Sequence, residues 1–320
     1  MKCNICKNEN GLKRMMITEM MHEGKEVFSY RYCQTCGTLS LEDIPANMEL
    51  YYNSKYYSFN ENKWENEKHV KADAFLLAPR MRGWGWTKAA VQMIFRRPKY
   101  LKYIGMNCSD KHAWILDVGC GNGDFVKYLR KHGYIHAYGI DPFTKLETEI
   151  VLRKDIFELS KAEKNKYDII IMNHSFEHMD NPEMVLDTVK RMLKSDGVLM
   201  LRIPVCGGLA WRMFGRYWYQ IDAPRHLYLY SRKALEMLAK RTGFYIKCIE
   251  YDSDSSQFLV SHLYSKGITM SHFNHEIICS TVNKVTRILY KALTLFINLL
   301  KEGDQAIFII CSEKEHGKEK

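Results

Sequence analysis

From Trp114 onward the chain alternates short apolar runs with segments in which apolar residues recur every three or four positions. Short runs predict strands and periodic segments predict helices. We expect strands over 114–118, 136–140, 149–153, 167–173, 198–203, 244–251 and 306–311. We expect helices over 124–131 and 232–240. A third helix should begin at Pro182, with Asn181 as its cap, and stop at Gly197. This alternation predicts an α/β fold, a doubly wound Rossmann-like seven-stranded sheet covered on both faces.

The chain before Trp114 follows a different pattern. Residues 1–45 carry paired cysteines, and residues 46–110 form a tyrosine-rich and basic aromatic connector that we expect to be helical or irregular. Residues 111–320 carry the sheet, with an insert at about 252–303 and a charged tail expected to fray. A length of 320 residues agrees with about two domains.

Four of the ten cysteines form two closely spaced pairs, Cys3-x-x-Cys6 and Cys33-x-x-Cys36. Two such pairs supply the four thiolates of a tetrahedral Zn²⁺ site, whereas a redox motif needs only one pair. We therefore expect a small N-terminal zinc ribbon. A closed four-thiolate shell has no position for a reacting water, so its zinc would be structural.

Composition narrows the class of protein. Hydrophobic residues make up 46% and charged residues 26%, which is typical of a globular protein and argues against disorder. No apolar run approaches the roughly 20 residues that cross a bilayer, and residues 1–10 lack an apolar signal region, so we expect a cytoplasmic protein. The net charge of +10 suits anionic partners such as nucleotides, RNA or lipid headgroups.

A glycine-rich turn follows the first strand of the predicted sheet, as Asp117-Val118-Gly119-Cys120-Gly121-Asn122-Gly123. Ligands of such sheets bind beyond the carboxyl ends of the strands, and glycines let the backbone approach them closely. Asp141 ends the next strand, where it can accept hydrogen bonds from both ribose hydroxyls. The third glycine comes one residue earlier than in a dinucleotide fingerprint, so the pattern indicates a nucleoside.

With these residues the chain resembles the class I S-adenosylmethionine-dependent methyltransferases. The first motif is 116–123, and the resemblance extends to 176–182 and 193–197, which look like the ubiquinone-type small-molecule enzymes. The paired cysteines, together with residues 222–227, are similar to methyltransferases of bacterial sugar and surface-polysaccharide pathways.

The resemblance implies a set of cofactor contacts. The methionine part of S-adenosylmethionine would lie against the turn, the ribose against Asp141 and the adenine amine near Asp155, with Asn173 at the end of the fourth strand. The contacts expected at the turn are Asp117, Gly119, Cys120, Gly121 and Gly123. The chain departs from a compact member of the class in its segment of about 50 residues between Tyr251 and Ala306.

Methyl transfer to a hydroxyl or a carbon requires a base, and histidine suits that role near neutral pH. Three histidines lie on segments that should face the site: His174, His178 and His226. We expect His226 to be the base, because its loop also carries Asp222, and we rank His178 with Glu177 second. For each histidine taken alone, a packing or surface role is the alternative.

Residues 174–178 also spell His-x-x-Glu-His, the pattern of inverted zinc peptidases. That motif must lie on a helix, whereas here a strand precedes it and a new helix begins at Pro182, so we do not expect a peptidase. A Mg²⁺ ion at Glu177 and His178 stays open, since related ubiquinone-type enzymes carry a metal-binding carboxylate and histidine near this turn.

Two functions remain open. The first is O- or C-methylation of a small molecule, namely a sugar or polysaccharide precursor linked to a nucleotide or a lipid. The second is RNA base methylation, with the ribbon and the basic stretch 74–109 binding phosphates and bases. The fourth strand ends in 173–176 without the proline pair that grips planar amines, which argues against amine chemistry. The intact cofactor motif disfavours a non-catalytic binding module.

Two further features have alternative interpretations. Trp84 and Trp86 would either form a substrate platform or, as we favour, bury the ribbon against the core. The helix expected over 282–301 carries an apolar stripe that suits a membrane surface, packing on its own domain, or a dimer. The sequence leaves the oligomeric state open.

Overall fold

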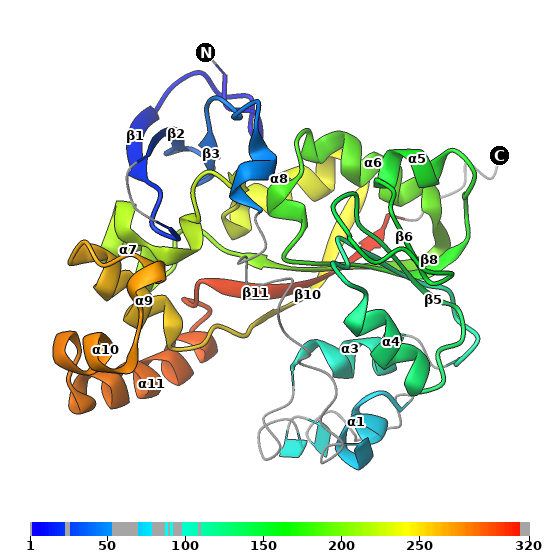
Figure 1. The fold of residues 1–320 in the computed structure, drawn as a ribbon. Coiled ribbons are helices and arrows are strands. Elements are labelled where there is room, and N and C mark those ends of the chain that lie inside the picture. The colour runs from blue at the N-terminus through cyan, green and yellow to red at the C-terminus, as the bar shows by residue number, and fades with distance from the viewer. Residues whose placement is uncertain are drawn as a thin grey trace.

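The computed structural model describes residues 2–22, 26–52, 70–78, 87–88, 90–91, 98–107 and 110–313. Its centre is a seven-stranded sheet of order β10-β11-β8-β7-β4-β5-β6 (Figure 1). The strands are β4 (Ile115–Val118), β5 (Ala137–Ile140), β6 (Val151–Leu152), β7 (Tyr167–Asn173), β8 (Leu193–Pro204), β10 (Phe244–Tyr251) and β11 (Gln305–Ser312). Strands β4 to β8 are parallel, and β11 is antiparallel to both of its neighbours. The expected Rossmann-like α/β sheet is confirmed.

Helices cover both faces of this sheet, as Figure 1 shows. One face carries α5 (Ile156–Ser160), α6 (Pro182–Met192) and α8 (Arg232–Arg241), and the other carries α1 (Val70–Leu76), α3 (Tyr100–Asn107) and α4 (Asp124–Lys131). Strand β7 is apolar almost throughout because alternate side chains enter different cores: Ile170 and Met172 enter one, Ile169 and Ile171 the other.

The end of α6 differs from our expectation. Asn181 caps the helix by accepting a hydrogen bond from the Met184 amide, as predicted, but the helix ends at Met192 and β8 begins at once. The prediction that Gly197 stops the helix was wrong, because Gly197 lies inside β8. A Cβ atom there would lie 2.8 Å from the Tyr167 carbonyl oxygen, so the glycine permits close contact between strands.

A second sheet contains β1 (Leu12–Thr18), β2 (Val27–Cys33), β3 (Leu39–Leu41) and β9 (Tyr228–Leu229). Its first three strands come from the N-terminal segment, which we call the ribbon, whereas β9 follows β8 and α7 (Leu209–Phe214) of the large sheet. Buried ribbon side chains such as Ile17 and Tyr30 belong to the same hydrophobic core as α6 and α8. The ribbon therefore packs directly on the large sheet.

The segment between β10 and β11 forms α9 (Ser256–Ser265), α10 (His275–Thr281) and α11 (Lys284–Leu299). These helices lie together to one side of the large sheet, at the lower left of Figure 1. No helix in the described part of the chain is both long and apolar enough to cross a bilayer. Trp84, Trp86 and most of the basic stretch fall outside the described residues, as does the tail from 314 onward.

Candidate active site

A cavity of about 1860 Å³ opens beyond the carboxyl ends of β4, β5, β7 and β8. Its wall combines the glycine turn after β4 with side chains from the segments after β7 and β8 and from the insert helices α9 and α11. The predicted site residues that line it are Asp117, Gly119, Cys120, Gly121, Asp141, Asp155, Asn173, His178 and His226. The structure therefore brings together residues that are up to about 110 positions apart in the chain.

Two glycines of the turn are required by packing within the protein. Gly119 and Gly123 have φ angles of +79° and +74°. An added Cβ would lie 2.4 Å from the Cβ of Ser175 at the first position and 2.2 Å from Cγ2 of Val151 at the second. The glycines thus let the turn sit against β6 and the segment after β7, a reason that adds to the close ligand approach we expected.

Asp117 and Asp141 place two carboxyl groups at the turn. The Gly121 amide donates to Oδ2 of Asp141 at 3.0 Å, and the Phe143 amide donates to Oδ1 at 2.7 Å. The Thr144 amide also lies near this carboxylate, and because its two oxygens together have about four lone pairs, acceptor capacity remains for a ligand. Burial, reinforced by Asp141, raises the pKa of Asp117 to about 7, and burial also raises the pKa of Asp141. Both carboxyl groups are therefore poorly solvated in the absence of a polar ligand.

The other expected cofactor contacts already have partners within the protein. Asp155 caps α5, since its Oδ1 accepts from the Glu158 amide at 2.8 Å. The Asn173 side-chain oxygen accepts from Nη1 of Arg202 at 3.2 Å. Burial raises the pKa of Cys120, so this thiol is neutral. Because only Oδ1 of Asp155 is used by this cap, its Oδ2 could accept a hydrogen bond from an adenine amine.

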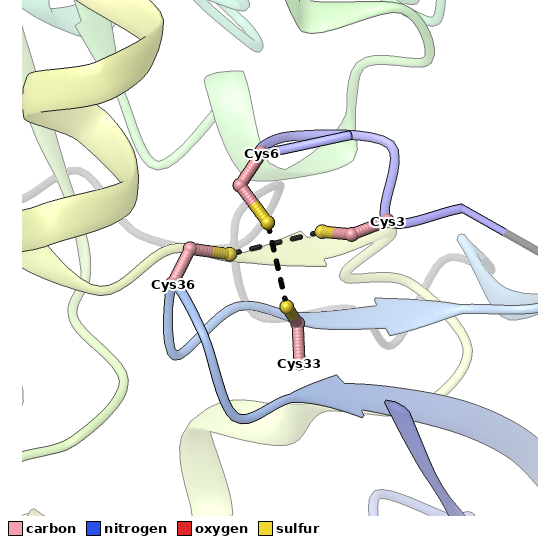
Figure 2. Close-up of side chains that lie close together, drawn as sticks. All are labelled: Cys3, Cys6, Cys33 and Cys36. Carbon is pink, nitrogen blue, oxygen red and sulfur yellow. Dashed lines mark hydrogen bonds between the residues drawn. The ribbon is translucent and has the colours of Figure 1, made fainter. Parts of the chain in front are cut away.

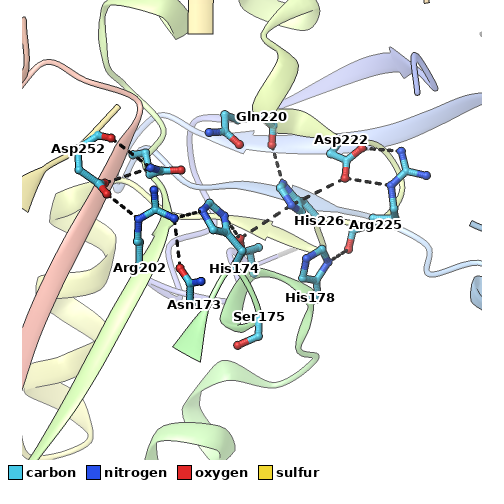
Figure 3. Close-up of polar contacts among 12 residues, drawn as sticks. Asn173, His174, Ser175, His178, Arg202, Gln220, Asp222, Arg225, His226 and Asp252 are labelled. Atoms are coloured by element: carbon cyan, nitrogen blue, oxygen red, sulfur yellow. Dashed lines mark hydrogen bonds and ion pairs between the residues drawn. The ribbon is translucent and has the colours of Figure 1, made fainter. Parts of the chain in front are cut away.

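His226 is buried in the cavity wall, and its tautomer follows from its contacts (Figure 3). Its Nδ1 lies 2.6 Å from the Gln220 carbonyl oxygen. A carbonyl only accepts, so Nδ1 carries the proton and Nε2 of the neutral ring keeps a lone pair. Nε2 lies 3.9 Å from Oε1 of Glu177 and 4.0 Å from Oδ2 of Asp222. The negative charges of these two carboxylates would stabilise the imidazolium that forms when Nε2 takes up a proton.

His178 lies beside His226, with ring centroids 4.7 Å apart. Its Nδ1 donates to the Arg225 carbonyl at 2.8 Å, and the Tyr52 hydroxyl lies 3.0 Å from the same nitrogen. Burial, together with the neighbouring His226, lowers the pKa of His178. This imidazole is therefore neutral at physiological pH and orients its neighbours.

His174 uses both ring nitrogens within the protein. Its Nε2 accepts from Nη1 of Arg202 at 2.9 Å, and its Nδ1 donates to Oε1 of Glu177 at 3.2 Å. Burial alone would raise the pKa of Glu177, but the hydrogen bond from His174 and the electrostatic effect of the three surrounding imidazoles hold it below its usual value. Oε2 of this anionic side chain is buried and has no hydrogen-bond partner among the described residues.

One group of possible metal ligands combines His178 and His226 of the cavity wall with Glu177, which does not line the cavity. Ligand atoms of Glu177, His178 and His226 lie within 4.8 Å of one another. Mg²⁺ prefers oxygen ligands, whereas two imidazoles and one carboxylate suit Zn²⁺ or another transition metal. The donor set therefore fits a magnesium site poorly.

Sequence reasoning missed two arginines of the site. Arg225 is fully buried, and it forms an ion pair with Asp222 and contacts Oε1 of Glu19 at 3.4 Å. Although burial opposes ionisation, Arg225 holds the pKa of Asp222 below its usual value. Arg202 donates to Oδ2 of Asp252 at 2.6 Å. A lone arginine inside the apolar strand 198–203 was a signal of such a buried ion pair.

The ribbon holds the loop that carries His226. The Tyr30 hydroxyl donates to the His226 carbonyl at 2.9 Å, and the Leu41 amide donates to the Leu227 carbonyl at 2.9 Å. The Leu227 amide donates in turn to the Glu177 carbonyl at 2.9 Å. Main-chain bonds therefore tie the ribbon, the His226 loop and the Glu177 turn together.

The four paired cysteines converge at one end of the ribbon (Figure 2). Cys3 and Cys36 bring their sulfurs to 3.7 Å, and Cys6 and Cys33 bring theirs to 3.5 Å. All four sulfurs lie within 4.8 Å of one another. A tetrahedral zinc with bonds of about 2.3 Å separates its sulfurs by about 3.8 Å, so the arrangement fits that ion.

Residues 94–249 match the profile of a family described as a methyltransferase domain. This range, a little under half of the chain, is therefore similar to methyltransferase domains. This match agrees with the resemblance to S-adenosylmethionine-dependent methyltransferases, which rests on the glycine turn and Asp141. The ribbon and the insert helices α9 to α11 lie outside the matched range.

Curated proteins are similar to part of this chain at low identity. The chain is 28% identical over 113 residues to a ubiquinone biosynthesis O-methyltransferase of Coxiella burnetii, covering 32% of this chain and 48% of that protein. It is 26% identical over 134 residues to a malonyl-[acyl-carrier protein] O-methyltransferase of Hamiltonella defensa, covering 39% and 50%. The chain thus spans about half the length of these relatives.

A solved structure is also similar to this chain. The crystal structure of a SAM dependent methyltransferase from Archaeoglobus fulgidus aligns with 70% of this chain and 98% of its own, at a TM-score of 0.43 and 18% identity.

Proposed function

We propose that this protein transfers a methyl group from S-adenosylmethionine to a hydroxyl oxygen or an acidic carbon of a small molecule, a sugar or polysaccharide precursor. The observation that carries the proposal is His226 at the cavity wall. Its Nδ1 proton is fixed on the Gln220 carbonyl, and its Nε2 lone pair lies between the carboxylates of Glu177 and Asp222. This arrangement suits a general base.

The cofactor part of the proposal rests on the turn after β4. Asp141 has lone pairs available for two ribose hydroxyls, and Asp155 has one oxygen available for the adenine amine. Asp117 lines the same cavity, and its buried carboxyl would face the charged methionine part of the cofactor. A cationic ligand compensates the desolvation that raises the pKa of Asp117.

In the reaction the acceptor oxygen or carbon attacks the methyl carbon in line, and the bond from methyl to sulfur breaks. The electron pair of that bond stays on sulfur, so the sulfonium becomes a neutral thioether. Nε2 of His226 takes the acceptor proton, and the resulting imidazolium is stabilised by Glu177 and Asp222 at 3.9 Å and 4.0 Å. Asp222 is kept anionic by Arg225.

The charge of the cavity supports a small-molecule acceptor over RNA. Among the described residues that line it, nine are acidic and four are Lys or Arg, and acidic residues still outnumber basic ones after the ion-paired Asp222, Glu250 and Asp252 are set aside. An acidic wall repels the phosphates of a nucleic acid, whereas its carboxylates accept hydrogen bonds from the hydroxyl groups of a sugar. The wall therefore favours a neutral polyol end on the acceptor.

We also propose that Cys3, Cys6, Cys33 and Cys36 bind one structural zinc ion. The support is the agreement between the sulfur separations and a tetrahedral four-thiolate shell. Zinc would stabilise the ribbon, and through Tyr30 the ribbon would position the loop of His226.

Methyl-labelled S-adenosylmethionine tests the function. Purified protein is incubated separately with a nucleotide-sugar pool, a lipid extract and total RNA, with His226→Gln protein as the control. We expect label in the nucleotide-sugar or lipid fraction, and far less of it with the variant. Label that enters RNA alone would overturn the choice of acceptor, and equal labelling by the variant would overturn the role of His226.

A further inference from the structure

Helix α11 presents an apolar face that no described residue covers. The exposed fractions reach 82% for Leu299 and 71% for Leu295, whereas Thr294 and Ile297 on the opposite side are buried. The exposed apolar positions are Val285, Ile288, Leu289, Ala292, Leu295, Phe296, Leu299 and Leu300. At 3.6 residues per turn these positions span roughly 140° of the helix circumference. We call this surface the apolar face of α11.

The apolar face continues into the proposed active site. Leu295 and Leu299 belong both to this face and to the cavity wall. The neighbouring wall is formed by further apolar side chains of the insert, Val260, Tyr264 and Met270. We call this part of the wall, formed by apolar side chains of the insert, the apolar end of the cavity, whereas His226 comes from the segment after β8.

The charge of α11 indicates what covers this face. The helix contains Lys284, Arg287 and Lys291 and no acidic residue. Lys284 and Lys291 are seven positions apart, so they lie on the same edge of the apolar face, and both are exposed. This pattern is typical of a helix that lies in a membrane interface, with lysines reaching anionic headgroups. A second copy of α11 would add the same basic residues and no acidic residue of the helix to pair with them.

We propose that the apolar face of α11 docks on an anionic bilayer and brings the apolar end of the cavity to the membrane surface. An acceptor joined to a lipid would then enter the cavity with its polar end toward His226. The choice of a lipid-linked acceptor rests on the proposed function, whereas docking on the bilayer does not.

Vesicle sedimentation with the full chain tests the docking. We expect binding to vesicles of phosphatidylglycerol and phosphatidylcholine, and weak binding to phosphatidylcholine alone. Changing Ile288→Gln and Phe296→Gln together should lower the partition coefficient about tenfold or more. The matched control is Ile135→Gln, which removes a similarly exposed apolar side chain elsewhere, 44% exposed against 56% for Ile288.

A second pair of variants tests the charge. Lys284→Gln with Lys291→Gln should weaken binding to the anionic vesicles and leave binding to neutral vesicles unchanged. Lys240→Gln, an exposed lysine on α8, is the control. Thermal unfolding and S-adenosylhomocysteine affinity are measured for every variant, so that lost vesicle binding is compared only among folded proteins.

Two results would overturn the docking. One is equal vesicle binding by the apolar-face variant and its control. The other is a dimer in the absence of vesicles that the apolar-face variant converts to a monomer, which would assign the face to a second copy. Because vesicle binding is measured without cofactor, either result leaves the proposed function intact. If the unaltered protein fails to bind S-adenosylhomocysteine, that result would contradict the proposed function and leave the docking proposal untouched.

Discussion

Replacing Asp141 with alanine tests whether the glycine turn binds a ribose. The carboxylate already accepts hydrogen bonds from the amides of Gly121 and Phe143, and its remaining lone pairs face the cavity. Losing hydrogen bonds to a charged group costs about 1 to 3 kcal/mol. We therefore expect the Kd for S-adenosylhomocysteine to rise roughly 5- to 150-fold.

Calorimetry with two ligands separates ribose binding from damage to the turn. The ligands are S-adenosylhomocysteine and an analogue that lacks both ribose hydroxyls. The unaltered protein should bind the analogue more weakly, whereas Asp141→Ala protein should bind both ligands with similar affinity. Asp187→Ala, at an exposed position on α6, is the control. The reasoning is refuted if Asp141→Ala leaves the affinity unchanged, or if the loss caused by removing the hydroxyls is the same in both proteins.

Three further predictions concern the base, the ribbon and a buried acid. His226→Gln should lower kcat about 10²- to 10⁴-fold with unchanged S-adenosylhomocysteine affinity, whereas His262→Gln should leave both unchanged. Cys36→Ser should reduce bound zinc from one ion per chain, measured by atomic absorption, and lower both Tm and kcat, with Cys279→Ser as the control. Burial raises the pKa of Asp304 to about 7 from 3.8, despite the Trp218 donor. The native state then holds a proton that the unfolded chain has lost, so stability falls as pH rises from about 4 to about 7. Asp304→Asn should therefore stabilise the protein by about 2 to 4 kcal/mol at pH 8 and hardly at pH 4 in urea unfolding, and an equal effect at both would refute this.

The sequence predicted the large sheet well because its strands are read from local patterns. The apolar run of β7 and the cap at Asn181 depend on neighbours only a few residues away. The end of α6 could not be predicted in this way. Gly197 looks like a helix stop, yet its role is set by the Tyr167 carbonyl on the adjacent strand.

The candidate site likewise contains some features set by nearby residues in the sequence and others set by distant residues. The turn and Asp141 follow from motif and spacing, although which of these residues touch the cofactor stays a prediction. The state of His226 depends on a carbonyl of Gln220, which no side-chain pattern encodes. Arg225 meets Glu19 across more than 200 positions of sequence, a pairing that arises only once the ribbon packs on the sheet.

Because β3 pairs with β9, a strand of the N-terminal ribbon aligns the chain directly after the loop that carries His226. A chain trimmed to the matched methyltransferase range would keep every cofactor motif and lose the strand against which Tyr228 and Leu229 align. Such a fragment would also lose β11, the strand that lies between β8 and β10, so the large sheet could not form in the order described.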